Sequence, residues 1–165
     1  MGNIPPGIKK TAVLCVLKNG KHFLLLKRLK QPNQNMFTPV GGKLDPFEDP
    51  NTAAYRETRE ETGIHVEAFR YCGVLVESAP NDYNWSSFVY LAEIDLIAPP
   101  PCPEGELHWI AFDEVLDVPT PTTDWFIYKY LLEGRPFMLN AIYDDKGALT
   151  SMREEIANEE VFPGK

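Results

Sequence analysis

The sequence predicts a layered α+β domain, in which mixed strands lie between two helices in an α/β/α arrangement. First, runs rich in β-branched and aromatic side chains recur along the chain, separated by turn residues. Second, two segments carry both a start and a stop signal for a helix. Third, a length of 165 residues suits one domain, spanning 1–165, with a sizeable core.

The first two strands are expected at residues 11–18 (TAVLCVLK) and 22–27 (HFLLLK). Between them stands Asn19-Gly20, a dipeptide typical of the two-residue turn of a β-hairpin. An antiparallel pair is therefore expected to begin the sheet.

The first helix is expected to start after Asp49 and to stop at Gly63. The carboxylate of Asp49 can cap the helix, and Pro50 suits the first helical position. Glycine is the usual residue just past a helix end. Upstream of this helix, a polar stretch and the sequence FTPV lead to Gly41-Gly42, which we interpret as a loop.

The remaining elements follow from the same signals. A second helix is expected from about Asp124 to Leu132, capped by Thr122 or Thr123 and ended by Gly134. The acidic C-terminal tail, about residues 153–165 and including REEIANEE, is expected to form a short solvated helix or to fray. Further strands are expected at residues 64–69, 71–77, 86–94, 108–112 and 136–143.

The charge of the chain restricts its partners. A formal net charge of -8 at pH 7 disfavours a nucleic acid polymer or an anionic membrane, since both favour a basic face. A small anionic substrate stays compatible, because a bound cation can reverse the local sign. The three cysteines show no CxxC spacing, and the N-terminus lacks the apolar segment of a secretory signal. We expect free thiols and a cytoplasmic protein, with a homodimer left open.

Three carboxylates gather near the end of the first helix. Glu57 lies three and four residues before Glu60 and Glu61, so all three share one side of a helix. Like charges one turn apart repel by about a few tenths of a kcal/mol per pair. The last two also face the negative end of the helix dipole, which costs about 0.3–1 kcal/mol. A positive group is therefore expected nearby.

Two kinds of positive group fit. Arg56 and Arg59 could form a salt-bridged solvent face, the simpler interpretation. A hard divalent cation is the alternative: Mg²⁺ fits oxygen ligands best, and Mn²⁺ can substitute. The upstream residues favour the cation, because Gly41-Gly42 allows close backbone approach and Lys43 and Arg28 can hold phosphate oxygens. A carboxylate-bound cation beside glycines and basic side chains is typical of sites that act on phosphate esters.

Gly42, Glu48 and the run RETREETGI at residues 56–64 together resemble the Nudix box of the Nudix hydrolase family, here residues 42–64. Every glycine and charged position of that pattern is filled, which makes the match specific. The chain departs from the family at Thr58, where an aliphatic residue is usual. It departs again at Asp45 and Phe47, where glutamate and glycine are common.

The resemblance implies a Nudix α/β/α sandwich that uses Mg²⁺ to hydrolyse a nucleoside diphosphate linked to another group. The implied metal ligands are Glu57, Glu60 and Glu61 with the carbonyl of Gly42, and the implied catalytic residues are Glu57, Arg56 and Glu60. Arg56 would orient Glu57, and Glu48 would support the site. The general base varies within the family, so Glu57, which we favour, stands beside two alternatives from a later loop, Glu104 and Glu106.

The sequence indicates the nucleoside of the substrate less directly than it indicates the reaction. Several segments, among them GELHWIAFDEV, are similar to the MutT-like branch of the family, which cleaves oxidised purine nucleoside triphosphates such as 8-oxo-dGTP. In that branch Asp124 would read the base, although Thr123 and Pro121 replace two usual partners. Thr38 is a candidate pocket residue. With Arg28, Gly41 and Lys43, these two complete the predicted substrate-binding set.

The leading hypothesis is a nucleoside triphosphate pyrophosphohydrolase that acts on a small-molecule nucleotide. A pyrophosphatase for ADP-ribose or a nucleotide sugar is the main rival, and its products would contain a sugar phosphate. A Nudix-fold sensor that binds nucleotide without cleaving it belongs to a different class. The complete set of costly carboxylates speaks against that sensor, since a pure binder has no need of them.

Overall fold

Ten strands form one mixed sheet in this computed structural model, which describes residues 2–164. Along the main path the strand order is β10-β9-β8-β5-β6-β1-β2-β3, while β4 pairs with β1 and β7 pairs with β2. The β1–β6 and β5–β8 pairs are parallel, and the others are antiparallel. The elements are β1 (Lys10–Asn19), β2 (His22–Arg28), β3 (Phe37–Thr38), β4 (Val40–Lys43), α1 (Pro50–Thr62), β5 (Arg70–Ser78), β6 (Trp85–Glu93), β7 (Gly105–Ala111), α2 (Thr122–Glu133), β8 (Phe137–Tyr143), β9 (Leu149–Glu154) and β10 (Glu159–Phe162).

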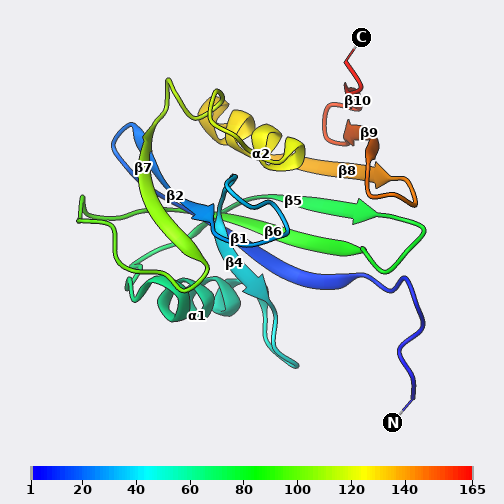
Figure 1. The fold of residues 1–165 in the computed structure, drawn as a ribbon, viewed down its shortest axis with the longest axis horizontal. Coiled ribbons are helices and arrows are strands. Elements are labelled where there is room, and N and C mark those ends of the chain that lie inside the picture. The colour runs from blue at the N-terminus through cyan, green and yellow to red at the C-terminus, as the bar shows by residue number, and fades with distance from the viewer. Residues whose placement is uncertain (1, 165) are drawn as a thin grey trace.

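The two helices cover opposite faces of the sheet, as the sequence predicts (Figure 1). Alternate residues of β1 show the division: Val13, Cys15 and Leu17 pack in the cluster that contains α1, and Val16 packs in the cluster that contains α2. Because both faces are buried, β1 and β2 read as nearly continuous apolar runs. The α/β/α arrangement is therefore confirmed.

The predicted hairpin and first helix are confirmed. β1 and β2 pair with Asn19 opposite His22, and Gly20 adopts a φ of 53° in the loop between them. At the start of α1, the Asp49 carboxylate accepts a hydrogen bond of 2.9 Å from the Thr52 N–H. At its end, Gly63 has a φ of 72° and donates to the carbonyl of Arg59.

The second helix also forms and ends at Gly134, but its predicted cap is wrong. Thr122 and Thr123 lie inside α2, and Pro121 occupies the capping position without a side-chain hydrogen bond. The strands expected at residues 71–77, 86–94, 108–112 and 136–143 form as β5, β6, β7 and β8, with small shifts at their ends.

The predictions for Gly41-Gly42, for residues 64–69 and for the C-terminal tail are wrong. The presumed loop at Gly41-Gly42 is strand β4, paired with β1. Residues 64–69 form no strand; Val66 is buried against the α1 side of the sheet, and the Phe69 N–H donates to the hydroxyl of Tyr55, so packing explains their apolar pattern.

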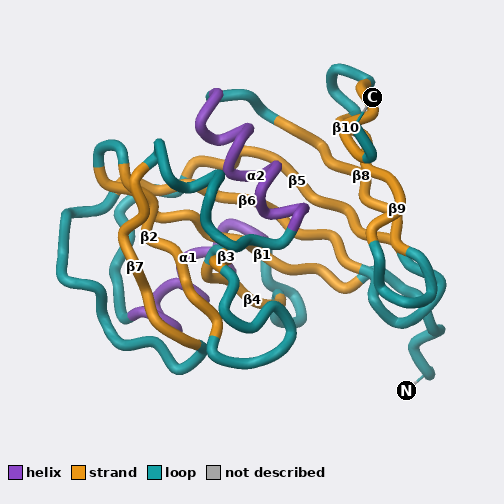
Figure 2. Tube along the Cα trace, turned by 45° about the horizontal axis from the view of Figure 1, so that its top comes forward, coloured by secondary structure: helices purple, strands orange, loops and turns teal. Residues whose placement is uncertain are grey.

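Residues 153–164 of the C-terminal tail form neither a helix nor a frayed end. Its residues belong to β9, a turn and β10, at the edge of the sheet (Figure 2). The carboxylate of Glu154, fully buried, accepts hydrogen bonds from the N–H groups of Met138, Ile156 and Ala157. These three bonds fix a turn that the acidic composition of this segment does not predict.

Candidate active site

The guanidinium group of Arg56 links α1 to the segment that precedes it. It donates to both carboxylate oxygens of Glu48, at 2.7 and 2.8 Å, and to the carbonyl of Lys43 at 3.1 Å. Its remaining nitrogen donates to Glu57 at 2.9 Å and to Glu60 at 3.1 Å. Hydrogen bonding to Glu48 raises the pKa of Arg56, and the same pair lowers the pKa of Glu48. Arg56 therefore holds Glu57 in a fixed orientation.

Glu57 lies directly against β4. A Cβ atom added to Gly42 would come within 2.4 Å of the Glu57 carboxyl carbon, so only glycine leaves room for the carboxylate there. Gly41 is equally crowded, because a Cβ atom there would meet the carbonyl oxygen of Val13 at 2.0 Å. The two glycines permit close approach, as predicted, but within a strand and not within a turn.

Glu61 reaches the same strand one residue away. Its Oε2 accepts a long hydrogen bond of 3.4 Å from the N–H of Gly41. Burial raises the pKa of Glu61 to about 7, and the negative charges of Glu57 and Glu104 add to the rise. This corner of the molecule therefore carries more negative charge than its neighbours neutralise.

The fit to a divalent cation rests on these two carboxylates. Glu57 is 14% exposed and Glu61 is partly buried, whereas the Glu60 side chain is 60% exposed and turns to Arg56. Across residues 2–164, no three side chains of aspartate, glutamate, histidine or cysteine converge on one point. Carboxylate oxygens whose negative charge is not fully neutralised, placed beside the backbone of two glycines, nevertheless suit a hard cation. The described residues thus supply two carboxylates for it, and the part of Glu60 stays a prediction.

The two alternative bases differ in their surroundings. Glu104 lies 3.7 Å from the guanidinium group of Arg28 and close enough to Glu61 to raise its pKa. Glu106 instead faces His108 at 3.3 Å and is 66% exposed. Of the two, only Glu104 is placed beside the carboxylates of α1.

A cleft of about 920 Å³ lies on the α2 side of the sheet, next to β4. It is lined by all five predicted substrate-binding residues, Arg28, Thr38, Gly41, Lys43 and Asp124, and by Gly42. The carboxylates of α1 do not line it, but Gly41 and Gly42 belong both to its wall and to the contact with those carboxylates. Strand β4, here called the glycine strand because it contains Gly41 and Gly42, therefore contacts the carboxylates of α1 and also forms part of the wall of the cleft.

The cleft also contains one carboxyl group that the sequence did not reveal. Glu77 in β5 lines it and is only 6% exposed, and the tyrosine hydroxyls that contact Glu77 come from positions 83 and 143. The hydroxyl of Thr38 is buried without a hydrogen-bond partner among the described residues. An acidic residue at an inward position of an apolar strand was the available signal for Glu77.

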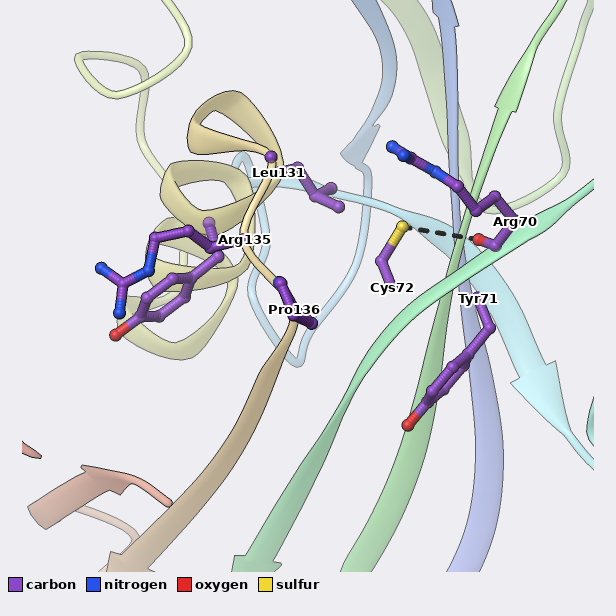
Figure 3. A pocket seen from close by; sticks show the side chains of 8 residues that line it. Arg70, Tyr71, Cys72, Leu131, Arg135 and Pro136 are labelled. Carbon is purple, nitrogen blue, oxygen red and sulfur yellow. Dashed lines mark hydrogen bonds between the residues drawn. The ribbon is translucent and has the colours of Figure 1, made fainter. Parts of the chain in front are cut away.

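A second, smaller pocket of about 100 Å³ lies between the start of β5 and the end of α2 (Figure 3). There the thiol of Cys72 donates a hydrogen bond of 3.4 Å to the carbonyl of Arg70. The pocket contains no predicted site residue, and its lining is Arg70, Tyr71, Cys72, Tyr130, Leu131, Gly134, Arg135 and Pro136. It therefore has no part in the site described above.

Comparisons with known proteins identify the family of this chain. The family model described as NUDIX domain matches residues 8–133. The Nudix hydrolase YvcI of Bacillus subtilis (strain 168) is 25% identical over 128 residues, which cover 73% of this chain and 78% of that protein. The NAD-capped RNA hydrolase NudC of Haemophilus influenzae is 30% identical over 118 residues, covering 67% of this chain and 42% of NudC.

The fold has a similar solved counterpart. The crystal structure of the mutator MutT protein from Bacillus halodurans superposes with a TM-score of 0.79 at 26% identity, covering 89% of this chain and 98% of that one. Neither helix of residues 2–164 combines the length and the apolar character needed to span a membrane.

Proposed function

The chain belongs to the Nudix hydrolase family, whose substrates are nucleoside diphosphates linked to another group, and from this premise we propose that it is a Mg²⁺-dependent nucleoside triphosphate pyrophosphohydrolase. The products would be a nucleoside monophosphate and pyrophosphate. One observation carries the proposal: Glu57 and Glu61 contact the glycine strand that also walls the cleft lined by Arg28 and Lys43.

Different residues of the chain would bind the phosphate groups and the cation. Lys43 and Arg28 line the cleft and would hold phosphate oxygens by charge-assisted hydrogen bonds. Glu57 and Glu61, with the backbone of Gly42, would hold the cation. The cation held there would supply the positive charge that offsets the charge developing on the departing pyrophosphate.

Proton transfer is assigned to Glu57. Arg56 donates to Oε1 of Glu57, and Oε2 has no hydrogen-bond partner among residues 2–164, so Oε2 can accept a proton from water. The water oxygen bonds to one phosphorus of the triphosphate, and the bond from that phosphorus to the bridging oxygen breaks. The pyrophosphate leaves with the electron pair of that bond. Glu104 is the alternative acceptor, because it lies on the Arg28 side of the same corner.

An oxidised purine such as 8-oxo-dGTP is the first substrate to test. Its support is the likeness to the mutator MutT protein and the position of Asp124 in the cleft. A diphosphate bridging two larger groups, as in ADP-ribose or a nucleotide sugar, is the second candidate. The match to a protein named for NAD-capped RNA favours that second class.

The three cysteines are free thiols, which supports a reducing compartment such as the cytoplasm. Mn²⁺ would replace Mg²⁺ at the same oxygen ligands.

The test is a substrate panel with product identification. Wild-type protein with Mg²⁺ is offered dGTP, 8-oxo-dGTP, ADP-ribose and a nucleotide sugar, and products are separated by chromatography. We expect a monophosphate and pyrophosphate from a triphosphate, and a loss of about 10²–10⁴-fold in kcat for Glu57→Gln. Glu114→Gln, on an exposed turn, is the matched control and should retain full turnover. Binding of nucleotide with no cleavage by the wild type would identify a sensor and refute the proposal.

A further inference from the structure

Helix α1 covers only part of its own side of the sheet. It packs over β1 and β4. On the same side, neither helix of residues 2–164 lies over β5 and β8, which extend the sheet beyond β6 (Figure 1). The side chains that point to this side are here called the uncovered face. They are Tyr71, Val74, Val76 and Ser78 of β5, Ser86 and Phe88 of β6, Met138, Asn140 and Ile142 of β8, and Ser151 and Arg153 of β9.

The uncovered face has an apolar centre that solvent reaches. Val74 lies between Phe88 and Met138 on the neighbouring strands, and all three side chains are partly exposed. Tyr71 and Ile142, near opposite ends of the face, are 53% and 40% exposed. The ring of Tyr71 lies beside that of Phe88, with the centroids 6.4 Å apart. Contiguous apolar surface of this kind marks an interaction site.

The uncovered face carries almost no charge. Six of its eleven residues are apolar, four are serine or asparagine, and the last is Arg153 at the margin. The guanidinium group of Arg153 donates to the carbonyl of Asn158 at 3.3 Å and so is already engaged. The chain as a whole has a net charge of -8, so two copies repel each other over most of their surface. At this face they can approach without bringing negative charges together.

The register of the strands makes the uncovered face complementary to itself. β5 lies between β6 and β8, so a two-fold axis along β5 places β6 of one copy against β8 of a second copy. Phe88 and Met138 are both level with Val74, on either side of it. Phe88 of one copy would therefore face Met138 of the other, and Val74 would face its own counterpart.

The neighbouring row of the face repeats this match. Ser86 and Asn140 are both level with Val76, so each would face the other across the axis. A serine hydroxyl and an asparagine amide can exchange hydrogen bonds. Val76 lies on the axis and would face Val76 of the second copy. Apolar side chains thus oppose apolar ones, and polar side chains oppose polar ones.

We propose that the uncovered face is the interface of a homodimer, in which two sheets pack face to face, about 10 Å apart, around a two-fold axis along β5. Four strands and the length of residues 71–78 give each copy roughly 19 Å by 26 Å, or about 500 Å². The total of about 1,000 Å² is the lower limit for a specific interface, so the dimer would dissociate in the micromolar range. The cleft lies on the other side of the sheet, so association leaves it open and is independent of the proposed hydrolysis.

The experiment is sedimentation velocity of the full chain from about 1 to 200 µM, the range that a weak interface requires. We expect wild-type protein to be monomeric at the low end and dimeric at the high end. Val76→Lys should weaken association by about 100-fold or more, because two like charges would face each other on the axis. Leu96→Lys, at a position 69% exposed and outside the uncovered face, is the matched control and should associate as the wild type does.

A mixture of two variants tests the axis itself. Val76→Lys and Val76→Glu should each be monomeric alone, and an equimolar mixture should dimerise, because opposite charges then face each other. Wild-type protein that stays monomeric at the highest concentration would overturn the proposal. A dimer that survives in Val76→Lys, or a mixture that fails to associate, would also overturn it. Thermal melting reports whether the variants fold, and the wild-type measurement stands as a test even if they do not.

Discussion

Adding one methyl group to β4 should disable the site without unfolding the protein. In Gly42→Ala the new Cβ atom would lie 2.4 Å from the carboxyl carbon of Glu57 and 2.5 and 2.6 Å from its two oxygens. Ordinary contact starts at 3.4 Å, so the carboxylate must retreat by roughly 1 Å. A misplacement of that size in a catalytic group costs about 100-fold in rate. Because the displaced atoms end a flexible side chain, we expect the unfolding free energy to change by less than about 1 kcal/mol.

The assay is steady-state kinetics on the best substrate of the panel, with thermal unfolding of each variant. Gly41→Ala is the contrasting variant, since its Cβ would meet a backbone oxygen at 2.0 Å and should destabilise the fold by about 1–3 kcal/mol. A Gly42→Ala, Glu57→Gln double variant should be no slower than Glu57→Gln alone, because both changes act on one carboxylate. A Gly42→Ala protein with wild-type kcat would refute the reasoning, and so would an unfolded one.

Three more predictions concern charge and strain. The Glu60→Gln, Glu61→Gln double variant should lose most hydrolysis at any Mg²⁺ concentration while its melting temperature holds or rises slightly, since repulsion falls; undiminished turnover would exclude both as metal ligands. Phe47 adopts a φ of 68° with its ring fully exposed, so Phe47→Gly should raise the unfolding free energy by about 1 kcal/mol in urea titrations; an unchanged midpoint would contradict this. The pKa of Asp124, about 8 in the fold against about 3.9 when unfolded, means that the native state retains a proton that the unfolded chain releases. Wild-type stability should therefore fall as pH rises from 5 to 8, and Asp124→Asn should flatten that slope; parallel slopes would show that Asp124 titrates normally.

The elements that the sequence predicted correctly are those set by local chemistry. The β1–β2 turn needs only Gly20 and its neighbours, and α1 needs only Asp49 and Gly63 at its ends. Each signal acts within a few residues, so no knowledge of the rest of the fold is required. The predicted cap of α2 was wrong because Pro121, which has no side-chain hydrogen-bonding group, occupies the capping position and both threonines lie inside the helix.

The elements that were missed depend on contacts far along the chain. β4 is a strand because β1, some 30 residues earlier, pairs with its backbone, and two adjacent glycines give no strand signal of their own. Residues 64–69 carry a strand signal but form no strand. Their apolar side chains pack on the α1 side of the sheet, while their backbone pairs with no strand. The turn after β9 depends on Glu154, whose carboxylate replaces a backbone acceptor for three N–H groups.

The acidic residues beside the cleft and within it show why composition alone could not define the site. Glu57 and Glu61 lie beside backbone and other carboxylates, so a cation would complete them. Glu77 and Asp124 are also acids, yet two tyrosine hydroxyls donate to Glu77, and burial raises the pKa of both carboxyl groups. A cation suits those two groups less well, because hydroxyl donors already contact one of them and burial favours the protonated form of both. Mg²⁺ should therefore increase thermal stability through the α1 carboxylates alone, and Glu77→Gln should leave that increase intact.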